Sequence, residues 1–131
     1  MSRKIIIHLS TKNVPAARAF YTALGFTVNE EMSRDVSVCI VMSDTISAMF
    51  SAESAFANFS PRAVCDTSKY LEVLNNLTCS SRAEVDDLIR RAIGAGGSVF
   101  EEAEVHGSIY MHSFLDPDGH GWNLLHMPET P

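Results

Sequence analysis

Five histidines are the side chains of this 131-residue chain best suited to move a proton or to hold a metal ion. An imidazole titrates near neutral pH, so it can accept a proton, orient a carbonyl group or bind a divalent ion. His8 stands out because it lies in K-I-I-I-H-L-S, an apolar run with the composition of a strand. Its alternative role is structural, as a histidine bonded to a neighbouring strand or exposed at a rim. The other four are His106, His112, His120 and His126.

One of these histidines belongs to the stretch F-L-D-P-D-G-H-G-W-N, residues 114–123. Asp116, Pro117, Asp118 and Gly119 fit a type I turn, in which Asp bonds the backbone, Pro presets φ and Gly comes last. Apolar residues precede and follow the turn. The stretch therefore predicts a hairpin near the end of the chain.

The first half of the chain predicts a strand, a helix and three further strands. Residues 4–10 are β-branched and apolar, and Asn13 is a candidate N-cap for a helix with Pro15 in its first turn. Gly25 ends that helix. Three short runs rich in Val, Ile and Phe follow: F-T-V-N-E-E, V-S-V-C-I-V-M and T-I-S-A-M-F.

The second half repeats this order. Y-L-E-V-L-N-N-L-T-C is strand-like, and a capping box between Ser81 and Glu84 begins a helix that the glycines around Gly96 end. Three predicted strands follow, S-V-F-E-E, S-I-Y-M-H-S-F-L and W-N-L-L-H-M. The buried face of the helix is predicted from residues at helical spacing: Val85, Leu88, Ile89 and Ala92.

An internal duplication of this kind predicts an α+β fold made of tandem βαβββ modules. We expect a single domain over residues 1–131, with repeat 1 at about 4–50 and repeat 2 at about 70–127. The connecting arm, about 51–69, shows no clear period and is long for a connection inside a compact domain. Phe56 and Phe59 in this arm are predicted either to close a pocket or to pack in a dimer.

The composition excludes several classes of partner. The net charge is -6 and the basic residues are scattered, which argues against nucleic acid and against an anionic membrane surface. No apolar run approaches the roughly 20 residues needed to cross a bilayer, and the short apolar start does not fit a signal peptide. The three cysteines suggest neither a disulfide framework nor a zinc knuckle. We therefore expect a cytoplasmic protein.

Two motifs together carry a resemblance to a known family. F-Y-T-A-L-G-F on the first predicted helix and F-L-D-P-D-G-H-G-W-N in the last predicted hairpin resemble the vicinal oxygen chelate superfamily. This superfamily includes glyoxalase I, bleomycin and fosfomycin resistance proteins and extradiol dioxygenases, and the resemblance covers about residues 4–127. It implies two curled sheets that form a cup, often completed across a homodimer. In metal-dependent members, His, Glu or Gln side chains on four strands hold a divalent ion in that cup.

The resemblance places the four metal-ligand positions at residues that do not suit a divalent ion. The motifs assign them to Ile6, Met49, Leu74 and Asn123. Ile and Leu have no donor atom, a thioether suits soft metals, and one amide oxygen cannot hold an ion alone. The sequence thus predicts that no cofactor is bound.

A metal-free small-molecule site is the simplest interpretation of such a cup. The two-residue period of a strand places His8, Ser47, Asn76 and Leu125 on the same side as the four positions. The predicted pocket is mainly apolar with a few polar groups, as small-molecule sites usually are. Its residues are Ile6, His8, Ser47, Met49, Leu74, Asn76, Asn123 and Leu125.

Two alternatives stay open at this point. A divalent metal ion bound by His8 and His112 would make the protein a lyase or dioxygenase with relocated ligands, and opposite sheet faces for these side chains would exclude it. The other alternative is a dimeric scaffold. Dimerisation itself follows from the resemblance and from apolar side chains near Phe56 and Phe59. Trp122 is expected to face away from Asn123 and to pack against a helix or a subunit.

Overall fold

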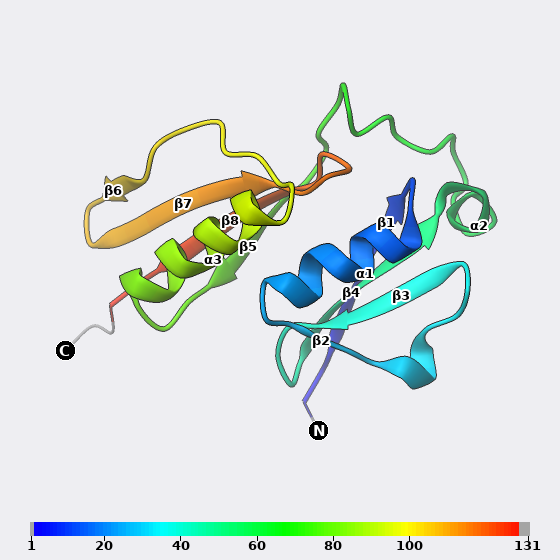
Figure 1. The fold of residues 1–131 in the computed structure, drawn as a ribbon, viewed down its shortest axis with the longest axis horizontal. Helices are drawn as coiled ribbons and strands as arrows, with labels where there is room; N and C mark the ends of the chain where they lie inside the picture. The colour runs from blue at the N-terminus through cyan, green and yellow to red at the C-terminus, as the bar shows by residue number, and fades with distance from the viewer. Residues whose placement is uncertain (1, 129–131) are drawn as a thin grey trace. The chain divides into compact units, whose positions relative to one another are not determined.

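The computed structural model describes residues 2–128, and the chain divides into two compact units, Met1–Asp66 and Thr67–Pro131. Each unit contains one four-stranded mixed sheet and one long helix (Figure 1). This arrangement confirms the predicted α+β fold with a duplicated strand and helix order. No helix in the described range is long and apolar enough to cross a membrane.

The first unit has its strands in the order β1-β4-β3-β2. The edge strand β1 pairs in parallel with β4, and the other two pairings are antiparallel. The elements are β1 (Ile5–Thr11), α1 (Val14–Ala23), β2 (Thr27–Val28), the short 3-10 helix η1 (Glu30–Met32), β3 (Ser37–Val41), β4 (Ile46–Ala52) and α2 (Glu53–Ala57).

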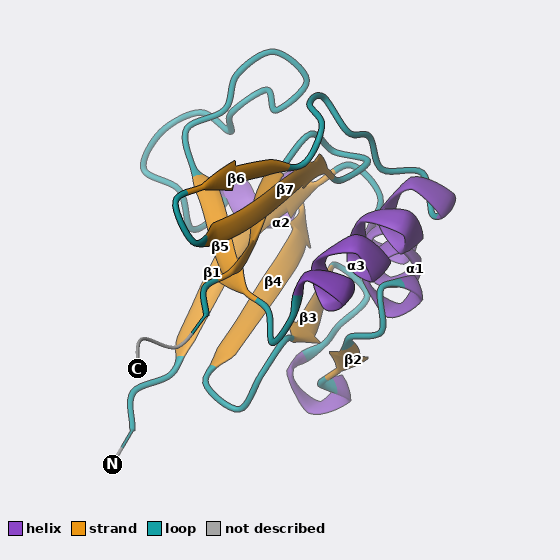
Figure 2. Ribbon diagram, turned by 90° about the vertical axis from the view of Figure 1, so that its left-hand side faces the viewer, coloured by secondary structure: helices purple, strands orange, loops and turns teal. Residues whose placement is uncertain are grey.

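The second unit has the equivalent strand order, β5-β8-β7-β6. Here β5 is the edge strand that pairs in parallel with β8, and the remaining pairs are antiparallel. Its elements are β5 (Leu74–Thr78), α3 (Arg82–Gly94), β6 (Glu104–His106), β7 (Ile109–Leu115) and β8 (Gly121–His126). Figure 2 shows α1 and α3 in purple, and each contacts strands of its own unit's sheet.

Both long helices begin at the predicted caps. The side chain of Asn13 accepts a hydrogen bond from the amide of Ala16 at 2.9 Å, and Pro15 lies in the first turn of α1. In the second unit, Ser81 Oγ accepts from the amide of Glu84 at 3.0 Å. The Glu84 carboxylate accepts a hydrogen bond from the amide of Ser80. In a standard capping box this donor would be the amide of the N-cap residue itself, one residue later.

Each helix covers one face of its sheet with apolar side chains. In the first unit, fully buried Tyr21 of α1 stacks on Phe50 of β4, with ring centroids 4.6 Å apart. In the second unit, Trp122 and Phe114 are buried in the sheet face that α3 covers. The predicted face of α3 is confirmed, because its buried residues are Val85, Leu88, Ile89 and Ala92.

The predicted hairpin turn forms at Asp116–Gly119. The amide of Gly119 donates to Asp116 O at 2.9 Å, and Gly119 has a φ of +94°, which side chains rarely tolerate. A Cβ on this glycine would also lie 2.2 Å from Thr67 O. The turn therefore needs glycine both for its backbone conformation and for the close approach of the segment that precedes β5.

Several predicted strands differ from the structure, and residues 70–73 of the strand-like run Y-L-E-V-L-N-N-L-T-C precede β5. The run S-V-F-E-E, residues 98–102, is not a strand, although Ser98 forms an isolated bridge with Leu115. The strand at the edge of this sheet opposite β5 is instead β6, which begins two residues after this run. In the first unit, β2 has two residues and is followed at once by η1, because the Asn29 side chain caps that turn through the amide of Met32. Edge strands receive little help from neighbours, so their bounds are weakly encoded.

Candidate functional site

Strand register decides which side chains share a face of the first sheet. His8 pairs with Met49, and Ile6 pairs with Ser47, so these four predicted pocket residues share one face. Phe50 lies on the other face, where it stacks on Tyr21 of α1. We call the first surface the face opposite α1. The parallel pairing of β1 with β4 thus brings these four side chains to one surface of the first sheet.

His8 is the centre of a small cluster on the face opposite α1. Its Nε2 lies 2.8 Å from Ser51 Oγ, which is two residues beyond Met49 on β4. The rings of Phe56 and Phe59 meet the imidazole edge to face, with centroid distances of 4.9 and 5.4 Å. We call these four residues the His8 cluster. His8 lies on β1 and Ser51 near the end of β4, whereas Phe56 lies on α2 and Phe59 in the turn after it.

The surroundings of His8 favour the neutral imidazole. Burial lowers its pKa from the ordinary value, because the charged form loses hydration. Ser51 is almost completely buried, whereas the Phe59 side chain is largely exposed. A neutral ring bonded at one nitrogen can offer the other nitrogen as a donor or as an acceptor, depending on the tautomer.

Ser51 did not figure among the predicted pocket residues. The signal was present, since Ser47, Met49 and Ser51 follow the two-residue period of one strand face. The predicted strand ended at Phe50, whereas β4 continues to Ala52. Phe56 reaches His8 from the short helix α2, and Phe59 reaches it from the turn that follows α2. A short helix is one of the usual structures of such a connecting arm.

In the second unit, the predicted pocket residues also share one face. Leu74 pairs with Gly121, Asn76 with Asn123, and Thr78 with Leu125, so the predicted residues alternate along β5 and β8 on the same side. Tyr110 marks the other side, because its hydroxyl donates to Asp86 on α3 and its ring contacts Arg82. The predicted residues therefore lie on the face opposite α3.

Three of the side chains on this face are joined by hydrogen bonds. Ser113 Oγ donates to Asn123 Oδ1 at 2.6 Å, and Asn123 Nδ2 donates to Asn76 Oδ1 at 2.7 Å. These two hydrogen bonds fix the orientation of the Asn123 side-chain amide. The amide oxygen is the atom of this side chain that could bind a cation, and it already accepts a hydrogen bond from Ser113.

His112 lies on the side of the second sheet that α3 covers. It pairs with Leu124, not with Asn123, and so shares the sheet face of Tyr110 and Phe114. Its Nε2 contacts Glu101 O at 3.0 Å. His8 belongs to the other sheet, in the first unit. Trp122 is confirmed as facing away from Asn123, and it is buried on the side of α3.

The family's metal ion does not fit the four positions where its ligands belong. Ile6 and Leu74 are aliphatic, Met49 offers a thioether, and the amide of Asn123 is held by its two neighbours. These groups provide none of the carboxylates or imidazoles that Mn, Fe, Ni or Zn sites use. The residues at these four positions therefore do not fit the divalent ion of metal-dependent members.

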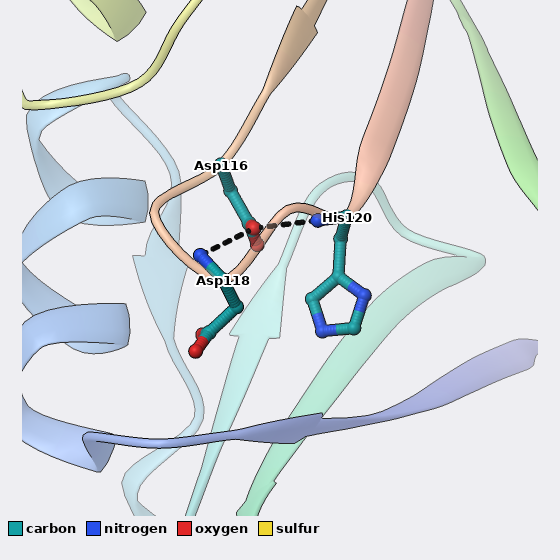
Figure 3. Close-up of side chains that lie close together, drawn as sticks. All are labelled: Asp116, Asp118 and His120. Carbon is teal, nitrogen blue, oxygen red and sulfur yellow. Dashed lines mark hydrogen bonds between the residues drawn. The ribbon is translucent and has the colours of Figure 1, made fainter. Parts of the chain in front are cut away.

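A different group of metal-ligating side chains lies in the hairpin turn. Asp116, Asp118 and His120 each have a ligand atom within 4.8 Å of those of the other two. Figure 3 shows that the Asp116 carboxylate points into the turn. There Asp116 Oδ1 accepts from the amides of Asp118 at 3.0 Å and His120 at 2.8 Å. The turn itself thus accounts for the position of this carboxylate.

Comparison with solved structures gives relatives that cover almost the whole chain. The hypothetical protein SA1046 from S. aureus is 28% identical, with a TM-score of 0.82, and the match covers 96% of this chain and 95% of that one. A glyoxalase/bleomycin resistance protein/dioxygenase family enzyme from Burkholderia phytofirmans PsJN is 20% identical, with a TM-score of 0.79 and coverage of 97% and 100%. A bleomycin resistance determinant encoded on transposon Tn5 is 18% identical, with a TM-score of 0.68 and coverage of 98% and 100%.

These structures share the fold of this chain, and their names assign it no specificity. Comparison with curated proteins gave no significant match. The family model described as Glyoxalase/Bleomycin resistance protein/Dioxygenase superfamily matches residues 5–124. The duplicated strand and helix order, the two mixed sheets and this match agree, and the chain belongs to the glyoxalase/bleomycin resistance protein/dioxygenase superfamily.

Proposed function

We propose that this protein binds a small organic molecule without a catalytic metal, with the His8 cluster as a principal contact. The observation that carries the proposal is the geometry of His8, whose ring lies 2.8 Å from Ser51 and edge to face with Phe56 and Phe59. Sites for small molecules combine apolar walls with a few oriented polar groups. The His8 cluster has this composition.

The ligand would contact both the aromatic rings and the imidazole. Among residues 2–128, His8 Nδ1 has no hydrogen-bond partner, so it remains able to bond a carbonyl or hydroxyl group. Ile6, Ser47 and Met49 on the same face would surround the rest of the molecule. In the second unit, we propose Leu74, Asn76, Asn123 and Leu125 as contacts for a small molecule on the face opposite α3.

Ligand-observed NMR with a panel of single-ring amides, ketones and phenols would test the proposal. His8→Phe keeps an aromatic ring and removes both nitrogens, and we expect it to weaken the bound compounds by up to about tenfold, the worth of one neutral hydrogen bond. Phe56→Ala should weaken them through lost ring contact. Val36→Ala, at a side chain that is 51% exposed, is the control and should change nothing. Equal affinities for His8→Phe and the control would refute the role of His8.

A homodimer in the cytoplasm forms part of this proposal. Apolar side chains are exposed on the edge strand β1, where Ile5 and Ile6 lie, and at Phe59, which is 75% exposed. Such exposure is typical of surfaces that a partner covers. Cys65 has an exposed side chain, which suits a reducing compartment. A monomer mass in light scattering at micromolar concentration would contradict the dimer.

A further inference from the structure

A hollow in the surface of the second unit has a volume of about 300 Å3, at the lower end of the range of small-molecule sites. The segment that precedes β5 forms one wall of this hollow. The loop after α3, the end of β7 and the hairpin turn complete it. The lining residues are Thr67, Ser68, Lys69, Tyr70, Leu71, Phe100, Leu115 and Gly119.

Contacts between these segments hold the walls in place. The Thr67 hydroxyl donates to Asp118 O in the turn, and the backbone of Thr67 occupies the space that a side chain on Gly119 would need. Ser98 and Leu115 exchange two backbone hydrogen bonds of 2.9 and 2.8 Å, which fix the start of the loop that carries Phe100. The walls of the hollow are therefore fixed by contacts within the second unit.

The lining combines exposed apolar surface with one cation. Tyr70, Leu71 and Phe100 are 68%, 47% and 54% exposed, which is high for large apolar side chains that lie around one hollow. Lys69 is the charged residue among the eight that line it. Within residues 2–128, Lys69 forms no ion pair, although the protein as a whole is acidic. The hollow thus offers an apolar contact surface and an available positive charge.

We propose that this hollow is a second binding site, which takes a small aromatic monocarboxylate. The apolar body of the acid would lie against Leu71, Phe100 and Leu115, and its carboxylate would pair with the Lys69 ammonium. The charge of the lining favours an acid over an amine or a neutral compound. The site lies entirely within the second unit and is independent of the His8 cluster.

A pair of probes with the same shape and different charge gives the test. 3-Phenylpropionate and its neutral amide, 3-phenylpropionamide, would be titrated into ¹⁵N-labelled full-length protein at low salt. We expect the acid to shift the amide signals of residues 67–71, Phe100, Leu115 and Gly119. The neutral amide should bind about fivefold more weakly, the size of one solvent-exposed ion pair. Added salt should reduce this difference.

Matched variants separate charge from shape. Lys69→Met removes the charge and keeps the stem, so the acid should lose about fivefold in affinity and should then bind like its amide. Lys4→Met removes a lysine in the first unit and should leave binding unchanged. Phe100→Ala should weaken both probes at this hollow, and His8→Phe should leave the shifts that either probe produces in residues 67–71 unchanged. No binding of the acid, equal binding of acid and amide by the unaltered protein, or equal effects of the two lysine substitutions would overturn the proposal.

Discussion

His8 Nε2 lies 2.8 Å from Ser51 Oγ, across the parallel pairing of an edge strand with its neighbour. Phe56 and Phe59 cover the same imidazole from the chain that follows β4. The contacts tie a titratable group on the face opposite α1 to a short aromatic segment. These contacts partly bury the imidazole. The pKa of His8 should therefore change when one of the contacting side chains is removed.

The pKa of His8 should be measurably below its ordinary value of about 6.5. A histidine with a lowered pKa in the folded state binds fewer protons than in the unfolded chain. Its contribution to stability is therefore fully present above the unfolded pKa and is lost as the pH falls towards the folded pKa. NMR titration of the imidazole carbon-bound protons would measure this pKa. Phe56→Ala should move it back towards 6.5, and an unchanged or raised pKa in the native protein would contradict the burial of the ring.

Removal of the buried Tyr21 ring in the first unit should lower the free energy of unfolding far more than removal of the exposed Phe59 ring. Tyr21 is fully buried against Phe50, so Tyr21→Ala should lower the free energy of unfolding by about 3 to 5 kcal/mol. Phe59 is 75% exposed, so Phe59→Ala should change it by less than about 1 kcal/mol. Urea unfolding of the two variants would make the comparison. Similar losses would contradict the described core.

Gly119 should be far more sensitive to substitution than Gly107. Both have positive φ, but a Cβ would meet Thr67 O at 2.2 Å at Gly119 and nothing within 4 Å at Gly107. Gly107→Ala should therefore cost about 1 kcal/mol for the backbone conformation alone. Gly119→Ala should cost at least about 2 kcal/mol more, because a backbone segment must shift. Melting temperatures of both variants would test this. Equal effects would show that the turn and the Thr67 segment are not in contact.

Metal binding should be absent at the family's ligand positions. We expect elemental analysis of untagged protein, after incubation with Mn, Fe, Ni and Zn, to give no stoichiometric metal, because the residues at those positions do not suit these ions. A chelator should also leave the melting temperature unchanged. Stoichiometric metal that persists in Asp118→Asn would contradict this prediction, whereas metal that Asp118→Asn abolishes would assign the ion to the group of Asp116, Asp118 and His120.

The three thiols should differ in reactivity. Cys65 is exposed, whereas Cys39 and Cys79 are buried. Burial, together with the nearby Glu84 carboxylate, raises the pKa of Cys79 to about 12, and burial also raises the pKa of Cys39. One thiol should therefore react rapidly with a disulfide reagent at pH 8 in native protein, since the thiolate is the reactive species. Cys65→Ser should remove this rapid reaction, and a persisting one would contradict the burial of the other two.

Local signals in the sequence were enough to determine the two long helices, the hairpin turn and the duplication. Asn13, Ser81 and the apolar spacing of α3 act within a few residues, so their effect can be predicted without tertiary contacts. Alternation along each strand was enough to predict that Ile6 shares a face with His8 and that Ser47 shares one with Met49, because the strand period of two is fixed by backbone geometry. The relation between the two strands came from the family resemblance.

The tertiary structure alone decided which distant residues meet. The contact of His8 with Ser51, Phe56 and Phe59 depends on how α2 follows β4, and the position of His112 on the face of α3 depends on its pairing with Leu124. The sequence likewise gave no sign that Thr67 approaches Gly119 and helps to form the hollow beside Lys69. Strand pairing and loop packing depend on contacts far apart in the chain, and a single sequence carries no local signal for them.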